Sequence, residues 1–535
     1  MRERFSRQLQ GLVTASEETD KTAGRLVDFP LLPPAAKLPK PPELTWRDYA
    51  IMLLHIASAI EHALMVQYLF AAHSLGGEQV PREHHTKVED WRNSILAVAK
   101  EEMGHLLTVQ NVLALLGGPV SLDREDHPWD HPFYPAPFTL APLSLESLAI
   151  YVFAEQPDDW NDDEAKEVRD RALEQARKFQ DAQKQSGVSE PEPHRVGLIY
   201  QTLIRILSDH NCIPDDAFHA GSLPQQASWD EWGRGYHGGP SDHGGASEHV
   251  GAPDANVRAD VMVDVVATRD QAVEALRRIS SQGESPNAAR RAVTGYDGNE
   301  RPVAAIRLEH RVQSDEKKKA EAAAGGAARS QKLSHFDRFL AIYREFPRPA
   351  DTDGWKPARD VVVNPVVLAN STDKAPPGCT AITDQRSKLW ASLFNLRYRM
   401  LLAYLTHALL LARQEEDGEV PSLRGAVMHR VFAEMYNLKT ISGILMRRPA
   451  GADRRCAGPP FQMPYTLALP ATPRNRWLLY KDLIREACNL RERLAAAPSP
   501  DEAGYLAAAA DIDRQIGIWL DQLLADAAAR RRAVA

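Results

Sequence analysis

The stretch that most constrains the fold is residues 95–107, ILAVAKEEMGHLL. Its apolar residues recur at three- and four-residue spacing, which predicts a helix with a buried face. Within this apolar run lie Glu101, Glu102 and His105. Glu102 and His105 stand at i and i+3, so their side chains leave the same helix face about one turn apart and could bind one metal ion. The alternative is a solvated helix edge on which Glu101 and His105 face water.

A second carboxylate lies in the long apolar helix predicted before this one. Glu61 is flanked by Ile60 and Leu64 in SAIEHALMVQYLF. A buried lone carboxylate is costly unless it is paired, protonated or bound to a metal. A glutamate on one helix and Glu-x-x-His on the next form half of a carboxylate-bridged two-metal site in a four-helix bundle. Tyr68 lies on the face of Glu61, where we expect it to pack in the core rather than to donate to a ligand.

The second half of such a site requires another glutamate and another Glu-x-x-His. The chain offers Glu284 and His335, but the residue three before His335 is Lys332. Lys332 leaves an asymmetric or single-metal site, or one that draws in another carboxylate. Glu155 in VFAEQPDD is the first substitute, and Glu309 is a weaker one. A further alternative is that the Lys332 ammonium takes the metal position and neutralises the carboxylates.

The rest of the chain predicts an all-α protein. Helices are expected over 45–75 and 87–116, and the short loop between them implies an antiparallel hairpin. Only ADVMVDVVA, residues 259–267, could pass for a strand. We expect four regions, namely a proline-rich arm (1–44), a metal-binding four-helix bundle with long inserted loops (45–348), a linker (349–385) and an additional C-terminal helical region packed on the bundle (386–535).

Composition excludes several classes of protein. The 64 basic and 72 acidic residues give a net charge of −8, which provides no electrostatic footprint for nucleic acid. The start of the chain lacks the apolar core of a signal peptide, and no apolar run is long enough to suggest a membrane span. We therefore expect a cytoplasmic protein without a membrane partner. The four cysteines form no CxxC pair, so neither a disulfide framework nor a thiolate zinc site is indicated.

Five blocks of the sequence resemble a known family. In chain order they are EHALMVQYLFAAHSL, AKEEMGHLLTVQNVLALLGG, FAEQP, SQGES and LSHFDRF. They resemble ferritin-like proteins of the iminophenyl-pyruvate dimer synthase type, which include the ferritin-like part of the enzymes that make the indole dimers of violacein and chromopyrrolic acid. The resemblance covers most of residues 45–475, including the C-terminal AGPPFQMPYTLALP. It implies a ferritin-like bundle with a metal-facing set of Glu61, Glu102, His105, Glu155, Glu284 and His335.

Two positions depart from the family pattern. Lys332 stands where a glutamate is expected, and Ser285 stands where a glycine usually follows the QGE block. The chain is therefore expected to be a divergent member of the family. The Lys332 departure bears on whether a full two-iron site exists.

Three functional hypotheses follow. The first is an oxidase or oxygenase that uses one or two non-haem irons, or manganese, with O2 on a small, amino-acid-derived metabolite. The second is a metal-binding or metal-free scaffold without catalysis. The third is coupling of two imine or enamine units, in which the carboxylates act as acid and base and the metal has little redox role. The sequence leaves open whether the C-terminal helices close the pocket or form a homodimer interface.

Overall fold

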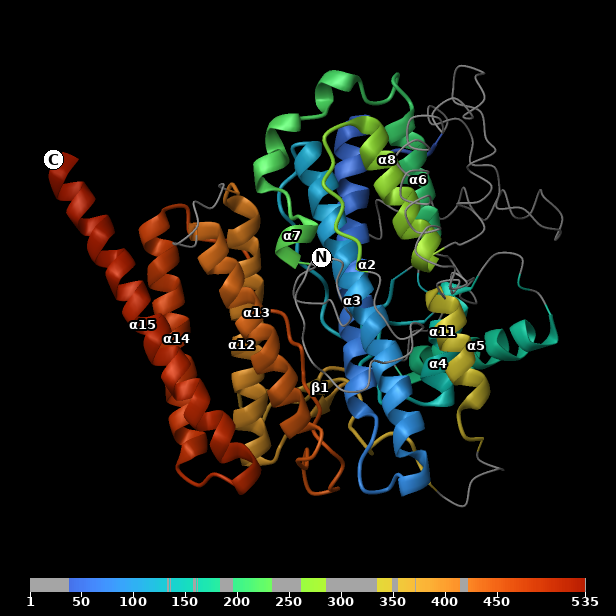
Figure 1. Cartoon of the computed structure of the whole chain (residues 1–535). Helices are drawn as coiled ribbons and strands as arrows, with labels where there is room; N and C mark the ends of the chain where they lie inside the picture. The colour runs from blue at the N-terminus through green and yellow to red at the C-terminus, as the bar shows by residue number, and fades with distance from the viewer. Residues whose placement is uncertain are drawn as a thin grey trace, which may run out of the picture.

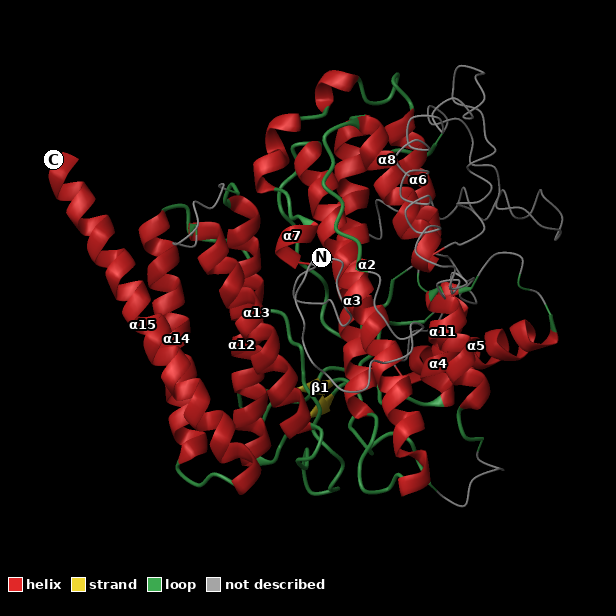
Figure 2. Cartoon of the chain, viewed as in Figure 1, coloured by secondary structure: helices red, strands yellow, loops and turns green. Residues whose placement is uncertain are grey.

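The regular secondary structure of the computed structural model is almost entirely helical, as Figure 2 shows. It describes residues 38–131, 134, 136–156, 160, 162–182, 196–232, 261–284, 334–348, 355–370, 372–413 and 422–534. The strands in this part of the chain are β1 (Pro365–Val366) and β2 (Thr380–Ala381), which pair in parallel with Pro365 opposite Thr380. The predicted all-α fold class is confirmed.

Two long helices form the antiparallel hairpin that the sequence predicts. Helix α2 (Trp46–Ser74) begins at a capping box between Thr45 and Asp48, and α3 (His85–Leu115) follows the short η2 (Arg82–His84). The chain leaves α2 through Gly76, which has a φ of 86° that glycine adopts without a steric cost. Helix α2 is long and apolar enough to cross a membrane, but 72% of its most apolar window is buried inside the protein. It is a core helix of the bundle.

Four shorter helices cover the hairpin as two pairs. In Figure 1, α6 (Gly197–Ser208) and α8 (Arg269–Ile279) lie beside one half of the hairpin. The second pair, α4 (Leu145–Glu155) and α11 (His335–Glu345), lies beside the other half, with α5 (Asp163–Ala182) packed on α4. The two pairs meet near the middle of the hairpin, where a π-helical turn, η7 (Ser280–Glu284), extends α8. Short helix ends therefore converge on the centre of the long helices.

The segment that resembled a strand crosses α3 as extended chain. Residues 261–267 form no strand, and their backbone passes directly over Gly104. A Cβ on Gly104 would lie 2.5 Å from the Met262 carbonyl oxygen, so only glycine allows this crossing. Asn111 and Thr108 bind the crossing segment through its backbone at Asp264 and Met262. The short η3 (Asp215–Ala217), η4 (Ala220–Gln225) and α7 (Trp229–Trp232) precede it.

The C-terminal helices form a second group beside the hairpin. This group, shown at the left of Figure 1, consists of α12 (Gln385–Leu410), α13 (Leu423–Leu445), α14 (Pro473–Ala495) and α15 (Pro500–Val534). Phe70 of α2 and Leu106 of α3 belong to the same buried cluster as Phe394 and Leu402 of α12. The additional helices predicted for the C-terminal region are confirmed, whereas the division of the whole chain into four regions stays a prediction.

Candidate metal centre

Five acidic and imidazole side chains meet where the short helices end. The hairpin contributes Glu61 from the middle of α2, and Glu102 and His105 from α3. Glu155 is the last residue of α4, and His335 is the first residue of α11. Each of the five residues is at most 2% exposed. The structure thus brings together residues separated by up to 274 positions in the chain, from Glu61 to His335.

The five side chains form two groups that share Glu102. In the first group, His105 Nδ1 lies 2.9 Å from Glu102 Oε2 and 3.3 Å from Glu61 Oε2. In the second, His335 Nδ1 lies 3.3 Å from Glu102 Oε1 and 3.7 Å from Glu155 Oε2. Within each group the three candidate ligand atoms lie within 4.8 Å of one another. Glu102 therefore presents one oxygen to each group, as a carboxylate that bridges two metal ions does.

Several of these atoms lack a hydrogen bond. Glu61 Oε2, Glu102 Oε1 and His335 Nδ1 are fully buried and have no hydrogen-bond partner. Leaving a buried polar atom unpaired costs about 1–3 kcal/mol, so three at one place call for an explanation. A cation in the first group would use the lone pair of Glu61 Oε2, and a cation in the second would use those of Glu102 Oε1 and His335 Nδ1. The residues present therefore fit a metal ion better than they fit a purely hydrogen-bonded cluster.

The charges of the cluster depend strongly on one another. Burial raises the pKa of Glu61 to about 7, with Glu102 adding repulsion and His105 opposing the shift. Burial alone would lower the pKa of His105, but the hydrogen bond to Glu102 and the nearby Glu61 and Glu102 carboxylates raise it to about 10. Burial also opposes ionisation of Glu102, yet His335 and His105 hold its pKa well below the usual range. Without a metal, imidazolium–carboxylate attraction therefore holds the cluster together.

A second layer of side chains holds these groups in place. Tyr200 of α6 donates to Glu61 Oε1, and Tyr68 of α2 donates to Glu155 Oε1 at 2.7 Å. The expectation that Tyr68 only packs in the core is wrong: its ring is buried, but its hydroxyl orients a member of the cluster. The imidazole Nε2 atoms point away from the shared carboxylate. His105 Nε2 lies 2.9 Å from Gln282 Oε1, and His335 Nε2 lies 2.8 Å from Glu101 Oε2.

The alternative of a solvated helix edge on α3 is also wrong. Glu101 and His105 are both fully buried. Glu101 lies on a different face of α3 from Glu102 and binds Arg338, whose Nη1 is 3.0 Å from Glu101 Oε1. The pair of consecutive glutamates is therefore explained by two different roles. The sequence offered one signal for this contact, because Arg338 follows His335 at i+3 and shares its face of α11.

The start of α11 and the end of α4 supply the second pair of cluster residues. Ser334 is the extended N-cap of α11, and its side chain forms a capping box with Asp337. The helix thus begins at His335. The carboxylate beside His335 comes from Glu155. Glu284 belongs to η7, but its side chain lies outside the described part of the chain, as do Lys332 and Glu309 entirely.

This geometry defines a helical-bundle protein with a buried carboxylate–histidine centre, and comparison with known proteins agrees. The profile of the ferritin-like family matches residues 54–344, and the chain belongs to that family. Dichlorochromopyrrolate synthase of Lentzea aerocolonigenes is 33% identical over 153 residues, which cover 25% of this chain and 15% of that protein. The match thus spans a small part of that relative. No solved structure matches the chain closely enough for comparison.

Proposed function

We propose that this protein is a non-haem iron-dependent oxidase or oxygenase that acts on a small, amino-acid-derived metabolite. One observation carries the proposal: two buried Glu/His groups share the Glu102 carboxylate. In a two-metal centre, Glu61 and His105 would hold one ion, Glu155 and His335 the other, and Glu102 both. Imidazole and carboxylate donors suit iron and manganese. Bound iron would supply redox chemistry with O2.

The protein's own residues would control access and protons at this centre. The cluster lies at the meeting point of the two short helix pairs, and we expect a substrate to reach it between the helix ends. Tyr200 and Tyr68 hold hydroxyl protons on Glu61 and Glu155. Metal binding would require His105 and His335 to lose their Nδ1 protons, because only a neutral imidazole nitrogen can ligate. The Nε2 protons would stay on the imidazoles, which donate them to Gln282 Oε1 and Glu101 Oε2.

Secondary metabolism is the finer part of the proposal. It is supported by the name of the matching relative, a synthase of dichlorochromopyrrolate, and by the five sequence blocks described above. Because the match covers a small part of both chains, the substrate, the reaction, a homodimeric assembly and a cytoplasmic location are all proposals for this protein.

A metal-free scaffold is the second candidate, and one observation favours it. His105 and His335 carry raised pKa values because carboxylates surround them. Two imidazolium ions can therefore neutralise much of the charge of Glu61, Glu102 and Glu155 without any metal. A protein that had lost its metal could keep the fold in this way.

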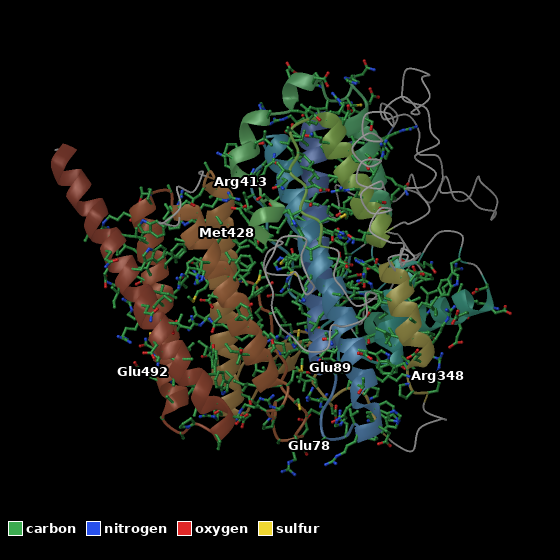
Figure 3. All side chains as sticks on the ribbon, viewed as in Figure 1. Glu78, Glu89, Arg348, Arg413, Met428 and Glu492 are labelled. Carbon is green, nitrogen blue, oxygen red and sulfur yellow. The ribbon has the colours of Figure 1, made fainter. Side chains whose placement is uncertain are left out.

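The test is oxygen uptake by the iron-loaded protein. The protein is loaded with Fe²⁺ under anaerobic conditions and then mixed with air-saturated buffer and imines of aromatic 2-oxo acids. We expect oxygen uptake that depends on substrate and is lost in Glu102→Ala but kept in Glu89→Gln, a change at an exposed ion pair on α3 (Figure 3). Metal binding without oxygen uptake, but with a coupled product, would favour acid–base coupling. No metal binding would favour the scaffold.

A further inference from the structure

The two halves of the centre differ in what holds their histidines. His105 Nε2 meets the neutral amide of Gln282, in the π-helical turn after α8. His335 Nε2 meets the carboxylate of Glu101, on α3. The two hydrogen-bond distances agree within 0.1 Å, at 2.9 and 2.8 Å. The two hydrogen bonds therefore differ in the charge of the acceptor rather than in length.

Arg338 keeps the Glu101 carboxylate in this position. Its Nη1 lies 3.0 and 3.1 Å from the two oxygens of Glu101, and both side chains are buried. Arg338 and His335 stand one turn apart on α11, so one helix face delivers both groups to Glu101. The guanidinium offsets the cost of burying this charge and contacts both oxygens of Glu101. Glu101 is thus held as an acceptor for the His335 N–H.

A carboxylate acceptor changes a metal-binding histidine more than an amide does. A hydrogen bond from the distal N–H to a carboxylate fixes the tautomer and raises the basicity of the nitrogen that ligates. A charged acceptor also forms a hydrogen bond roughly twice as strong as a neutral one. His335 Nδ1 is therefore the better donor of the two, and its lone pair faces Glu102 and Glu155.

We propose that Glu101 and Arg338 are a positioning pair that polarises His335, so that the metal position at His335 and Glu155 binds its ion more tightly than the position at His105 and Glu61. This inference rests on the proposed metal centre and goes beyond it, because it assigns unequal affinities to the two positions and names the residues responsible. It also gives Glu101 a role distinct from that of a ligand.

The experiment is an anaerobic calorimetric titration of the metal-free protein with Co²⁺, followed in parallel by the visible absorption of the bound ion. The parent is expected to bind two equivalents with separable affinities. Glu101→Gln should weaken the tighter event about 10- to 100-fold, the usual effect of removing such a partner, and shift its absorption band. The weaker event should stay within a few-fold of the parent. Arg344→Gln, at an exposed position of α11 where Arg344 pairs with the partly buried Glu164, is the matched control and should change neither event.

A second variant, which is expected to gain metal affinity, keeps the test decisive even if Glu101→Gln fails to fold. Gln282→Glu gives His105 a carboxylate acceptor, so the weaker event should tighten toward the stronger one. Two events of equal affinity in the parent, or an unchanged tighter event in Glu101→Gln, would overturn the inference while leaving the metal centre intact. If Glu101→Gln does not fold, an unchanged weaker event in Gln282→Glu overturns it. A parent that binds no Co²⁺ would overturn the proposed function and this inference together.

Discussion

Two neighbouring tyrosines both pack in the core, but only one of them also contacts the candidate metal centre. The rings of Tyr68 and Tyr151 lie 5.0 Å apart in a T-shaped contact, and both are buried. The Tyr68 hydroxyl donates to Glu155, whereas the Tyr151 hydroxyl has no hydrogen-bond partner. The two residues thus share a packing environment but differ in their contact with the centre.

Removing each hydroxyl should therefore have different consequences. We expect Tyr68→Phe to lower the affinity for a metal at the Glu155 position by about tenfold, because a metal-ligating carboxylate would lose its orienting partner. Tyr151→Phe should leave metal affinity unchanged. Calorimetric titration of both variants with Mn²⁺ measures the difference. Equal losses in the two variants would show that packing, rather than the hydrogen bond, sets the affinity.

The residues of the cluster that could be predicted from the sequence are those marked by their local spacing or by their apolar neighbours. Glu102 and His105 share a helix face at i and i+3, and Glu61 was conspicuous in an apolar helix. Glu155 could be proposed only as a substitute, because its approach to His335 depends on where α4 ends and where α11 begins. The contacts of Tyr200 and Gln282 carried no local signal, since they arise from the packing of separate helices. Whether these residues bind a metal stays a prediction.

At the level of elements, one glycine lets an extended segment cross α3 next to the centre. Gly104 lies between Met103 and His105, and the backbone of Val261–Val263 crosses it. By contrast, Gly443 in α13 faces open space, with its nearest neighbour, an Arg447 nitrogen, 3.9 Å from the position of a Cβ. Both glycines are in helices, so they make a matched pair.

We expect Gly104→Ala to lower the free energy of unfolding by roughly 1–3 kcal/mol, because the new methyl group collides with the Met262 backbone. Gly443→Ala should raise it by about 0.5–1 kcal/mol, since alanine is the better helix former. Urea denaturation followed by circular dichroism compares the two variants. A stabilising effect of Gly104→Ala would contradict the crossing.

The elements themselves followed from periodicity and caps, with informative exceptions. The expected helix ranges 45–75 and 87–116 lie close to α2 (Trp46–Ser74) and α3 (His85–Leu115), because the signals that start and stop a helix are local. Helix α11 begins at His335, where the Ser334 capping box sets its start. The alternating residues 261–267 form no strand because they lie against α3 and bind its side chains, with no neighbouring strand to pair with in the described part of the molecule.

At the scale of the whole molecule, a polar seam joins the hairpin to the C-terminal group. His62 Nε2 of α2 lies 2.5 Å from the Tyr398 hydroxyl of α12, and Arg124 binds the same hydroxyl and the Phe461 carbonyl. Within the C-terminal group, Glu502 near the start of α15 connects α15 to α12 and to the segment that follows α13. Its carboxylate accepts from Trp390 Nε1 at 2.8 Å and from Arg448 at 2.7 Å, and it also pairs with Arg386.

The Glu502 contacts predict a pH-dependent stability. Burial opposes its ionisation, but hydrogen bonds from Arg386 and Ser499 and the charge of Arg448 lower its pKa from 4.5 to about 2. A lowered carboxylate pKa stabilises the fold above pH 4.5, and the contribution is lost as the pH falls from 4.5 toward 2.

We therefore expect Glu502→Gln to cost roughly 2 kcal/mol at pH 7, the scale of hydrogen bonds to a charged group, and progressively less below pH 4.5. Glu492→Gln, at an exposed position of α14 (Figure 3), is the control and should be neutral. Urea unfolding monitored by tryptophan fluorescence at pH 7 and pH 3 tests both. A cost that stays the same at the two pH values would show that shape, rather than charge, matters at Glu502.

The central claim is that Glu102 is shared between two metal positions. Its most direct test is anomalous X-ray diffraction at the iron edge from crystals of the parent and of Glu102→Ala, both loaded with Fe²⁺ without oxygen. The account predicts two peaks in the parent, one beside Glu61 and His105 and one beside Glu155 and His335, with Glu102 between them, and weakened or absent peaks in the variant. A parent without any peak among these residues, or a Glu102→Ala variant that keeps both peaks at full strength, would contradict it.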